Sequence, residues 1–455
     1  MGDYISSNPF TEERLAKFDL LSEDELNKKI EISATAFRRW RNTSHPERKQ
    51  LLQHLSERLV ANKSQYAKTI TLEMGKPIKQ SLAEIKKCAL LCRHFAENAE
   101  GYLKPEGIQS EHAESNIHFE PLGVVFGIMP WNFPFWQVIR CAVPTIAAGN
   151  TFLLKHSENV PQCAKAIEDL FLAAGFPQGV FNNLFVSHDQ AAKIIEHPAI
   201  QGISLTGSEK AGSIVTAQAG KNLKKVVLEL GGSDPVIVFS DADMEKAVNT
   251  VVLSRFQNNG QSCIAAKRVI VAERIAPEFL ELLIRKFEEL QLGDPLLSGT
   301  DVGPLARKDL VTQLSLQVKA TVDAGAKSYI YKGKVPGKGY FYPPTLLYDI
   351  PKEAVSRKEE LFGPVLSVLT FKTEPEAVDL ANETRFGLGA AVWTNDLVKA
   401  RRIAFEIEAG CVFINALVKS EPGLPFGGIK KSGYGREMGE WGIREFTNIK
   451  TICIH

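Results

Sequence analysis

The chain has 455 residues, a formal net charge of +1, and 44% hydrophobic and 24% charged residues. This length exceeds what one hydrophobic core holds and predicts two or three domains. A net charge near zero gives no general attraction to nucleic acid or to an acidic membrane. Because no apolar run reaches the roughly 18 residues of a membrane span and the polar start has no signal-peptide core, we expect a cytoplasmic protein.

Cysteine usage indicates reduced thiols, because the seven cysteines are odd in number and scattered along the chain. Cys88 and Cys92 lie one helical turn apart, but no second Cys or His pair has zinc-site spacing, and residues 89–91 between them are apolar. We expect these two side chains in a buried helix and no metal site.

In chain order, residues 11–100 come first and carry apolar side chains at helical spacing, which predicts a mostly helical scaffold. Residues 103–121 contain two prolines and few helix signals. An extended arm or hairpin that pairs with another subunit or domain fits this second stretch.

From residue 122 short apolar runs alternate with helical stretches, which predicts a parallel sheet with helices on both faces. The expected strands are 122–129, 151–154, 180–185, 202–205 and 225–228, and the expected helices are 138–148, 160–174, 189–196 and 209–219. A second round of alternation runs from 235–239 through 267–271 and 278–290 to 412–414 and predicts a second α/β domain. The tail is glycine-rich and ends in an expected strand at 446–454.

The thiol of Cys263 follows a polar stretch, residues 258–262, in which Gly260 lets the backbone approach a ligand closely. Cys263 is therefore a candidate nucleophile, and because a free thiol has a pKa of about 8.5, the site must favour the thiolate. A small core residue is the alternative interpretation.

Glu229 ends the apolar run 226–228 and is followed by Leu230 and two glycines, at the expected seam between the domains. A carboxylate in this position can swing, accept a proton and activate water. The alternative is a strand-end salt bridge.

Three further stretches suggest ligand contacts. Two prolines fix the backbone around Asn132, so its amide is aimed as an oxyanion donor would be, although an Asx-turn is the commoner use of asparagine. Lys155 and Glu158 follow a strand and suit ribose hydroxyls, and the carboxylate would repel a 2′-phosphate. Residues 206–212 open a helix whose free N–H groups favour a phosphate, unless Ser208 is simply an N-cap.

Taken together these residues resemble the NAD(P)-dependent aldehyde dehydrogenase superfamily over essentially the whole chain. Six segments occur in the family's order, at 130–132, 207–212, 229–232, 260–263, 360–364 and 425–430. Within the superfamily the chain is most similar to short bacterial succinate-semialdehyde dehydrogenases, which lack a long N-terminal extension.

The resemblance implies an α/β fold with two Rossmann-like domains and a β oligomerisation arm, assembled as a homodimer or homotetramer. It places an NAD(P)-binding domain at 1–102 and 122–228 and a catalytic domain at 229–430. The oligomerisation arm and the C-terminal strand would occupy 103–121 and 431–455.

The resemblance also implies roles. Cys263 would be the nucleophile and Glu229 the base, and Asn132 with the Cys263 N–H would form the oxyanion hole. The implied reaction is thiolate attack on an aldehyde, hydride transfer to nicotinamide, and hydrolysis of the thioester, with succinate semialdehyde as the expected substrate. The expected cofactor site comprises Ile128, Pro130, Trp131, Lys155, Glu158, Gly207, Ser208, Gly212, Leu230, Glu360 and Phe362.

For the substrate carboxylate, the family's arginine on the helix after the Asn132 stretch matches Arg140, whose alternative role is a structural ion pair. The family's second arginine, six residues before the nucleophile, is Gln257 here, and Arg255 is out of register. Lys419 or Ser420 could substitute for it, and Phe426 completes the expected substrate site.

Several alternatives remain open on sequence alone. Glu158 favours NAD, although Lys155 beside His156 could accept NADP. The substrate could be an uncharged aliphatic or aromatic aldehyde. A CoA-acylating enzyme would not need the base at Glu229, and a structural protein that kept the fold would have lost Cys263.

Overall fold

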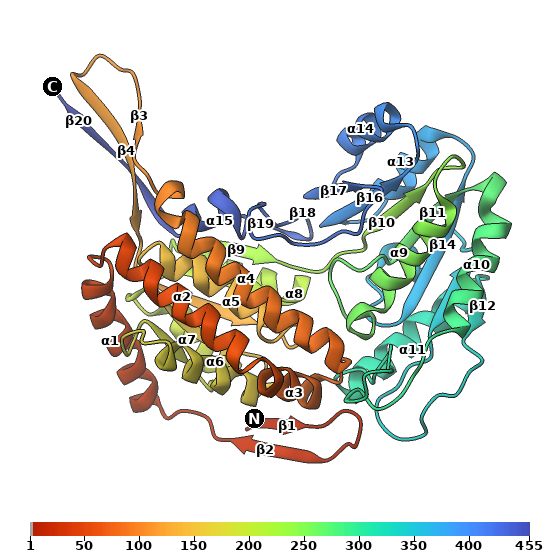
Figure 1. The fold of residues 1–455 in the computed structure, drawn as a ribbon, viewed down its shortest axis with the longest axis horizontal. Helices are drawn as coiled ribbons and strands as arrows, with labels where there is room; N and C mark the ends of the chain where they lie inside the picture. Colours follow the sequence, from red (N-terminus) through yellow and green to blue (C-terminus); the bar gives the residue numbers. More distant parts are fainter. Residues whose placement is uncertain (1–2) are drawn as a thin grey trace.

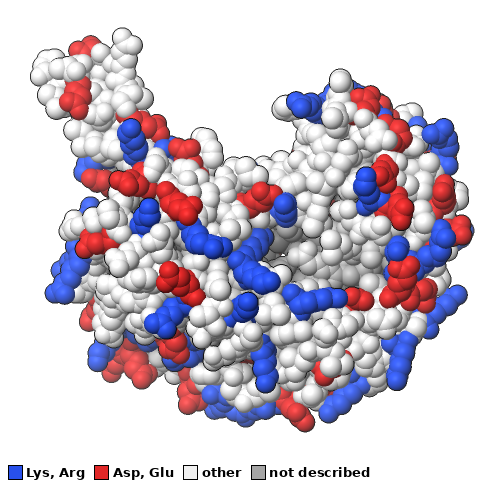
Figure 2. Space-filling model, viewed as in Figure 1, with Lys and Arg blue, Asp and Glu red and all other residues white. Residues whose placement is uncertain are grey.

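The computed structural model describes residues 3–455, and it has two α/β lobes with an arm that projects from the first lobe (Figure 1). Acidic and basic side chains are interspersed over the face shown in Figure 2, as expected for a net charge of +1. Within the described residues, no helix is long and apolar enough to cross a membrane.

The first lobe contains a six-stranded sheet. In spatial order its strands are β19 (Gly433–Tyr434), β9 (Lys225–Glu229), β8 (Ile200–Thr206), β5 (Val124–Met129), β6 (Thr151–His156) and β7 (Phe181–Asn183). The pairs among β5 to β9 are all parallel, and β19 joins the edge antiparallel. Every residue of β6 is buried, as expected for a strand covered on both faces. The parallel sheet predicted from residue 122 onward is confirmed.

Helices surround this sheet. They are α1 (Glu23–Trp40), α2 (His45–Ala61), α3 (Lys63–Met74), α4 (Ile78–Tyr102), α5 (Trp136–Ala147), α6 (Pro161–Ala173), α7 (His188–Glu196) and α8 (Glu209–Lys221). Capping boxes fix the start of α1, α2 and α7, where a serine and an acidic or amide side chain three residues later bond each other's backbone N–H. Cys88 and Cys92 lie buried in α4, as predicted.

Residues 11–100 are mostly helical, as predicted, but a hairpin of β1 (Tyr4–Ser7) and β2 (Arg14–Phe18), not anticipated from the sequence, comes before the helices. The hairpin is held by a long-range contact, because the buried Tyr4 hydroxyl is 3.0 Å from the Val186 carbonyl oxygen and donates to it.

The second lobe contains a seven-stranded sheet. In spatial order its strands are β12 (Lys327–Ile330), β13 (Thr345–Tyr348), β14 (Val365–Phe371), β11 (Arg268–Ala272), β10 (Pro235–Val238), β16 (Gly389–Trp393) and β17 (Cys411–Ile414). Its helices are α9 (Met244–Phe256), α10 (Ala276–Glu288), α11 (Lys308–Asp323), α12 (Val355–Lys358), α13 (Glu374–Asn382) and α14 (Leu397–Glu406), with 3₁₀ turns η1 (Gln257–Gly260) and η2 (Glu273–Ile275). The predicted second α/β unit is confirmed.

The arm is a three-stranded sheet of β20 (Thr447–Ile454), β4 (Glu114–Pro121) and β3 (Glu106–Gly107), so the predicted hairpin and final strand pair with each other. The rest of the segment 431–455 lies outside the arm: β19 pairs with β9, and α15 (Gly439–Arg444) packs against α4 and α5. A short pair of β15 (Phe386–Gly387) and β18 (Ile429–Lys430) leads from the second lobe back to the first.

The topology determines where loops meet. β9, β8, β5 and β6 are neighbours, so the residues that follow them gather at the carboxyl edge of the first sheet. The loops that enter β14, β11 and β10, also neighbours, gather at the amino edge of the second sheet. A cavity of about 910 Å³ is lined from both groups of loops.

Candidate active site

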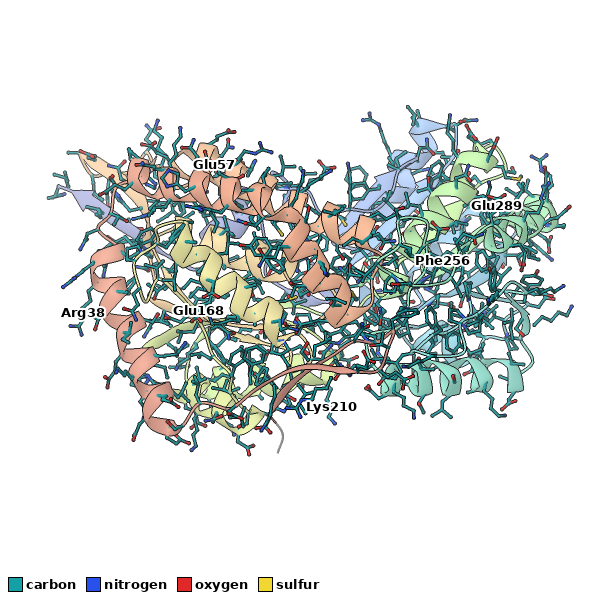
Figure 3. All side chains as sticks on the ribbon, turned by 60° about the horizontal axis from the view of Figure 1, so that its bottom comes forward. Arg38, Glu57, Glu168, Lys210, Phe256 and Glu289 are labelled. Carbon is teal, nitrogen blue, oxygen red and sulfur yellow. The ribbon has the colours of Figure 1, made fainter. Side chains whose placement is uncertain are left out.

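Cys263 follows a turn with an unusual backbone, which begins where α9 ends at Phe256 (Figure 3). Asn258, Asn259 and Gly260 are consecutive residues in the left-handed region, with φ of 58°, 57° and 76°. Asparagine and glycine are the residues that adopt this conformation at least cost. A side chain at position 260 would collide with the backbone of Gly363, so the turn packs tightly against the loop that enters β14.

Side chains of the same turn hold it in place. The Asn259 amide donates to the carbonyls of Gly75 at 2.9 Å and Pro304 at 2.8 Å, and its oxygen accepts from the Gly303 N–H at 2.7 Å. The Gln261 side-chain oxygen accepts from the Ala306 N–H at 3.0 Å. The turn is therefore bonded to segments far away in sequence.

Lys267 completes this support, and the sequence alone did not reveal it. Its ammonium donates to the carbonyls of Ser262 at 2.7 Å and Cys263 at 2.6 Å, and it pairs with Glu360 at 2.9 Å. The side chain is only 2% exposed. The available signal was a charged pair, Lys267 and Arg268, placed directly before the apolar run of β11.

Asn132 lies beside the turn. Its amide nitrogen donates to the Gln261 carbonyl at 2.9 Å, and its oxygen accepts from Gln137 at 3.0 Å. The Asn258 amide donates to the Asn132 carbonyl at 2.7 Å. The prolines that flank Asn132 thus orient an amide toward the Cys263 turn, and within residues 3–455 one of its two N–H bonds has no acceptor.

Cys263 lines the cavity together with Asn132. Burial raises the pKa of the Cys263 thiol to about 12, although the nearby positive charges of Lys267 and Arg140 act in the opposite direction. The thiol is therefore protonated at neutral pH in this arrangement, and a thiolate requires transfer of the proton to a base.

Glu229 ends β9, as predicted, and faces Gly433 across the antiparallel pair with β19. Its side chain is 2% exposed, and neither carboxylate oxygen has a hydrogen-bond partner among the described residues. Burial raises the pKa of Glu229 well above its usual value, and Glu437 adds to the increase while Arg140 opposes it. The strand-end salt bridge is weak, because the nearest guanidinium nitrogen of Arg140 is 3.9 Å away.

The predicted substrate residues have different surroundings. Arg140 is buried in α5, pairs with Glu437 and lies 4.9 Å over the Phe426 ring, so the structural ion pair is present. Lys419 is exposed and pairs with Glu421 at 2.9 Å. Gln257 begins η1 and lies outside the cavity lining. Buried Arg255 donates to the Gly260 carbonyl and supports the turn.

Most of the predicted cofactor residues line the 910 Å³ cavity, namely Pro130, Trp131, Gly207, Ser208, Leu230, Glu360 and Phe362. Ser208 is the N-cap of α8, with its hydroxyl accepting from the Ala211 N–H at 3.3 Å. Gly231 also belongs to the lining, where a larger residue would collide with the Glu360 carboxylate. Lining residues that the sequence did not indicate include Lys210 on α8 (Figure 3), Gln313, Gln317, Arg385 and Lys431.

Four predicted cofactor residues, Ile128, Lys155, Glu158 and Gly212, lie outside this lining. Lys155 is buried and pairs with Glu158 at 3.7 Å, and burial lowers the pKa of Lys155. Gly212 packs against Leu230, because a Cβ there would lie 2.8 Å from the leucine methyl groups. Gly212 thus brings α8 close to the end of β9.

The chain is similar to known proteins over almost its whole length. The model of the aldehyde dehydrogenase family matches residues 2–452. A Synechocystis sp. protein named probable NADP(+) succinate-semialdehyde dehydrogenase is 46% identical, over 98% of both chains. The Escherichia coli NAD(P)+ succinate semialdehyde dehydrogenase is 44% identical, over 98% of this chain and 97% of that protein. The structure of succinic semialdehyde dehydrogenase from Streptococcus pyogenes with NADP+ superposes with a TM-score of 0.97 at 34% identity, over 99% of both chains.

Proposed function

The chain belongs to the aldehyde dehydrogenase family, and we propose that it oxidises succinate semialdehyde to succinate with NAD(P)+ as the hydride acceptor. The observation that carries the proposal is the position of the Cys263 thiol. It lies in the wall of a cavity large enough for a dinucleotide, beside the aimed amide of Asn132. The named substrate of the relatives supplies the choice of aldehyde.

In this proposal Cys263 is the nucleophile. Its proton leaves to a base, and the sulfur adds to the aldehyde carbon to form a thiohemiacetal whose oxygen carries the developing negative charge. The unpaired N–H of Asn132 and the backbone N–H of Cys263 donate to that oxygen. Because the turn is fixed by Lys267 and Asn259, both donors are placed before the substrate arrives.

Glu229 is the proposed base for hydrolysis of the thioester. A carboxylate without hydrogen-bond partners is free to take a proton from water, and its raised pKa makes it a stronger base than an exposed glutamate. Gly427 lies against one oxygen of Glu229, so the glycine-rich tail leaves room for this side chain.

The cavity fits a nicotinamide dinucleotide, which would accept the hydride when bound. The N-terminus of α8 at Gly207 and Ser208 offers N–H groups to the pyrophosphate, and Glu360 with Phe362 would hold the nicotinamide ribose. Lys155 and Glu158 would contact the adenosine ribose. Because Glu158 is already paired with Lys155, its repulsion of a 2′-phosphate is reduced, and we propose that both NAD and NADP are accepted.

We also propose a homodimer or homotetramer joined through the arm. β20 is the edge strand of its sheet, and Ile449, Ile452 and Ile454 on it are 64%, 44% and 54% exposed. An exposed apolar edge strand is a surface for pairing with another chain. Light scattering of the purified protein tests this, and a monomer would contradict it.

The test of the substrate is the initial rate of reduced-nicotinamide formation with succinate semialdehyde and with butanal, each with NAD and with NADP. A higher kcat/KM for succinate semialdehyde supports the proposal. A preference for butanal would leave an aldehyde dehydrogenase with a different substrate. Turnover that requires added CoA would indicate the acylating reaction.

A further inference from the structure

Lys87 is a positively charged side chain of α4 that forms no salt bridge with the described residues. Its ammonium donates to the Ser420 hydroxyl at 2.7 Å and lies 4.1 Å over the ring of Trp136. Within residues 3–455 no carboxylate lies within salt-bridge distance of it, although most lysines near the active site have one, such as Lys155 and Lys267. A lysine held against an aromatic ring and a hydroxyl has an ammonium group that can still take up an anion.

Lys87 points toward the same region as the catalytic groups. α4 and α5 lie side by side (Figure 1). Trp136 and Arg140 are four residues apart, about one turn, and so lie on the same face of α5. Arg140 in turn lies over Phe426, and Cys263 packs against the apolar cluster that contains Trp136 and Phe426. Lys87 is not among the residues that line the 910 Å³ cavity, but its ammonium is near enough to Cys263 and Arg140 for their charges to affect its pKa.

The charge balance distinguishes Lys87 from Arg140. Arg140 is buried between Glu437 and Glu229, so its charge is already compensated. Lys87 is half-buried, and burial together with the nearby charge of Arg140 lowers its pKa to about 8, with weaker opposite effects of Cys88, Glu84 and Cys263. A carboxylate placed beside Lys87 would favour its charged form, whereas one beside Arg140 would compete with Glu437 and Glu229, whose carboxyl groups already lie near its guanidinium.

We propose that Lys87 and the Ser420 hydroxyl bind the distal carboxylate of the substrate, in place of the arginine that position 257 lacks. This inference rests on the proposed function, because it requires a substrate with a second carboxylate. The ammonium provides the charge, Ser420 provides a second hydrogen-bond donor once it no longer accepts from Lys87, and Trp136 fixes the position of the lysine. Arg140 is left to position Glu229 and Glu437.

The experiment compares kcat and KM for succinate semialdehyde and for butanal in the parent, K87M, K87R and K86M. Lys86 is the matched control, because it is the neighbouring lysine of α4 and its side chain is exposed. In K87M we expect kcat/KM for succinate semialdehyde to fall about 10- to 100-fold, mainly through KM, as for loss of one hydrogen bond to a charged group. Butanal should be unaffected, K87R should recover part of the loss, and K86M should match the parent.

The outcomes separate the two proposals. If the parent prefers succinate semialdehyde and K87M keeps that preference, the role of Lys87 is wrong and the proposed function stands. An equal loss with both aldehydes in K87M would mean that Lys87 only supports the fold, which also overturns the inference. A parent without preference for succinate semialdehyde overturns the proposed substrate, and the inference with it.

Discussion

The Cys263 turn and the surroundings of Glu229 differ in how their buried polar groups are hydrogen-bonded. Hydrogen bonds of 2.6 to 3.0 Å from the side chains of Asn259, Gln261 and Lys267 hold the turn in place. The Glu229 carboxylate is equally buried but has no hydrogen bond among the described residues. Burial without hydrogen bonds is costly for a charged group, so the pKa of Glu229 is raised and its carboxylate takes up a proton more readily, whereas Cys263 is held in place by the turn.

The largest expected effect comes from removing the Cys263 thiol. Cys263→Ala should lower turnover of any aldehyde by at least about 10⁴-fold, because no other group can form the covalent intermediate. NAD(P) binding, measured by fluorescence titration, should be retained. Near-parental turnover of Cys263→Ala would exclude Cys263 as the nucleophile.

The second prediction loosens the turn without touching its thiol. Lys267→Met removes two hydrogen bonds to the Ser262 and Cys263 carbonyls and leaves Glu360 unpaired. Breaking a buried pair in this way costs about 3–5 kcal/mol, so we expect a lower Tm and a kcat reduced about 10²-fold or more. The loss should be equal for succinate semialdehyde and butanal. A kcat close to that of the parent would show that the turn does not need this support.

The third prediction concerns the space around the Glu229 carboxylate. A Cβ at position 427 would lie 2.8 Å from the Glu229 carboxylate and 2.7 Å from the Gly435 carbonyl. Gly427→Ala should therefore slow hydrolysis of the thioester about tenfold, which corresponds to a barrier higher by about 1.4 kcal/mol. Gly101→Ala is the control, because a Cβ there meets nothing within 4 Å. Stopped-flow measurement of a burst before a slower steady state checks the expectation, and a variant with no change in the steady-state rate would contradict it.

The smallest expected effect is the pH dependence with butanal. Both Cys263 and Glu229 have raised pKa values, so their deprotonated forms become more abundant as pH increases above neutrality. The rate should therefore increase from pH 7 to pH 8, by no more than about tenfold per proton lost. A rate that decreases over this interval would mean that neither raised pKa limits the reaction.

Much of this site was visible in the sequence. Cys263 stands out because it follows a polar turn, and Glu229 because it ends an apolar strand before two glycines. The alternation of strands and helices predicted the parallel sheet of the first lobe and the α/β character of the second. The assignment of individual roles to these residues stays a prediction, as does the division into a cofactor-binding and a catalytic domain.

The remainder depends on long-range contacts that no local pattern records. Lys267 bonds the nearby turn, but its acidic partner Glu360 is distant in sequence, and Lys87 meets Ser420 from the other end of the chain. The β1–β2 hairpin was missed because its strands are short and Tyr4 is buried by contacts distant in sequence, such as the Phe185 ring and the Val186 carbonyl. Arg140 was expected to be a substrate contact, and only the fold shows the two glutamates beside it.

The most direct test of Cys263 as the nucleophile and Glu229 as the base for hydrolysis is mass spectrometry of Glu229→Gln. The intact protein would be mixed with NAD(P)+ and succinate semialdehyde, quenched in acid, and digested to locate any modification. We expect a succinyl thioester to accumulate on Cys263 in the variant. In the parent protein, sampled after the substrate is consumed, we expect Cys263 to be unmodified. A variant that hydrolyses at the parental rate, with Cys263 unmodified, would contradict the role of Glu229.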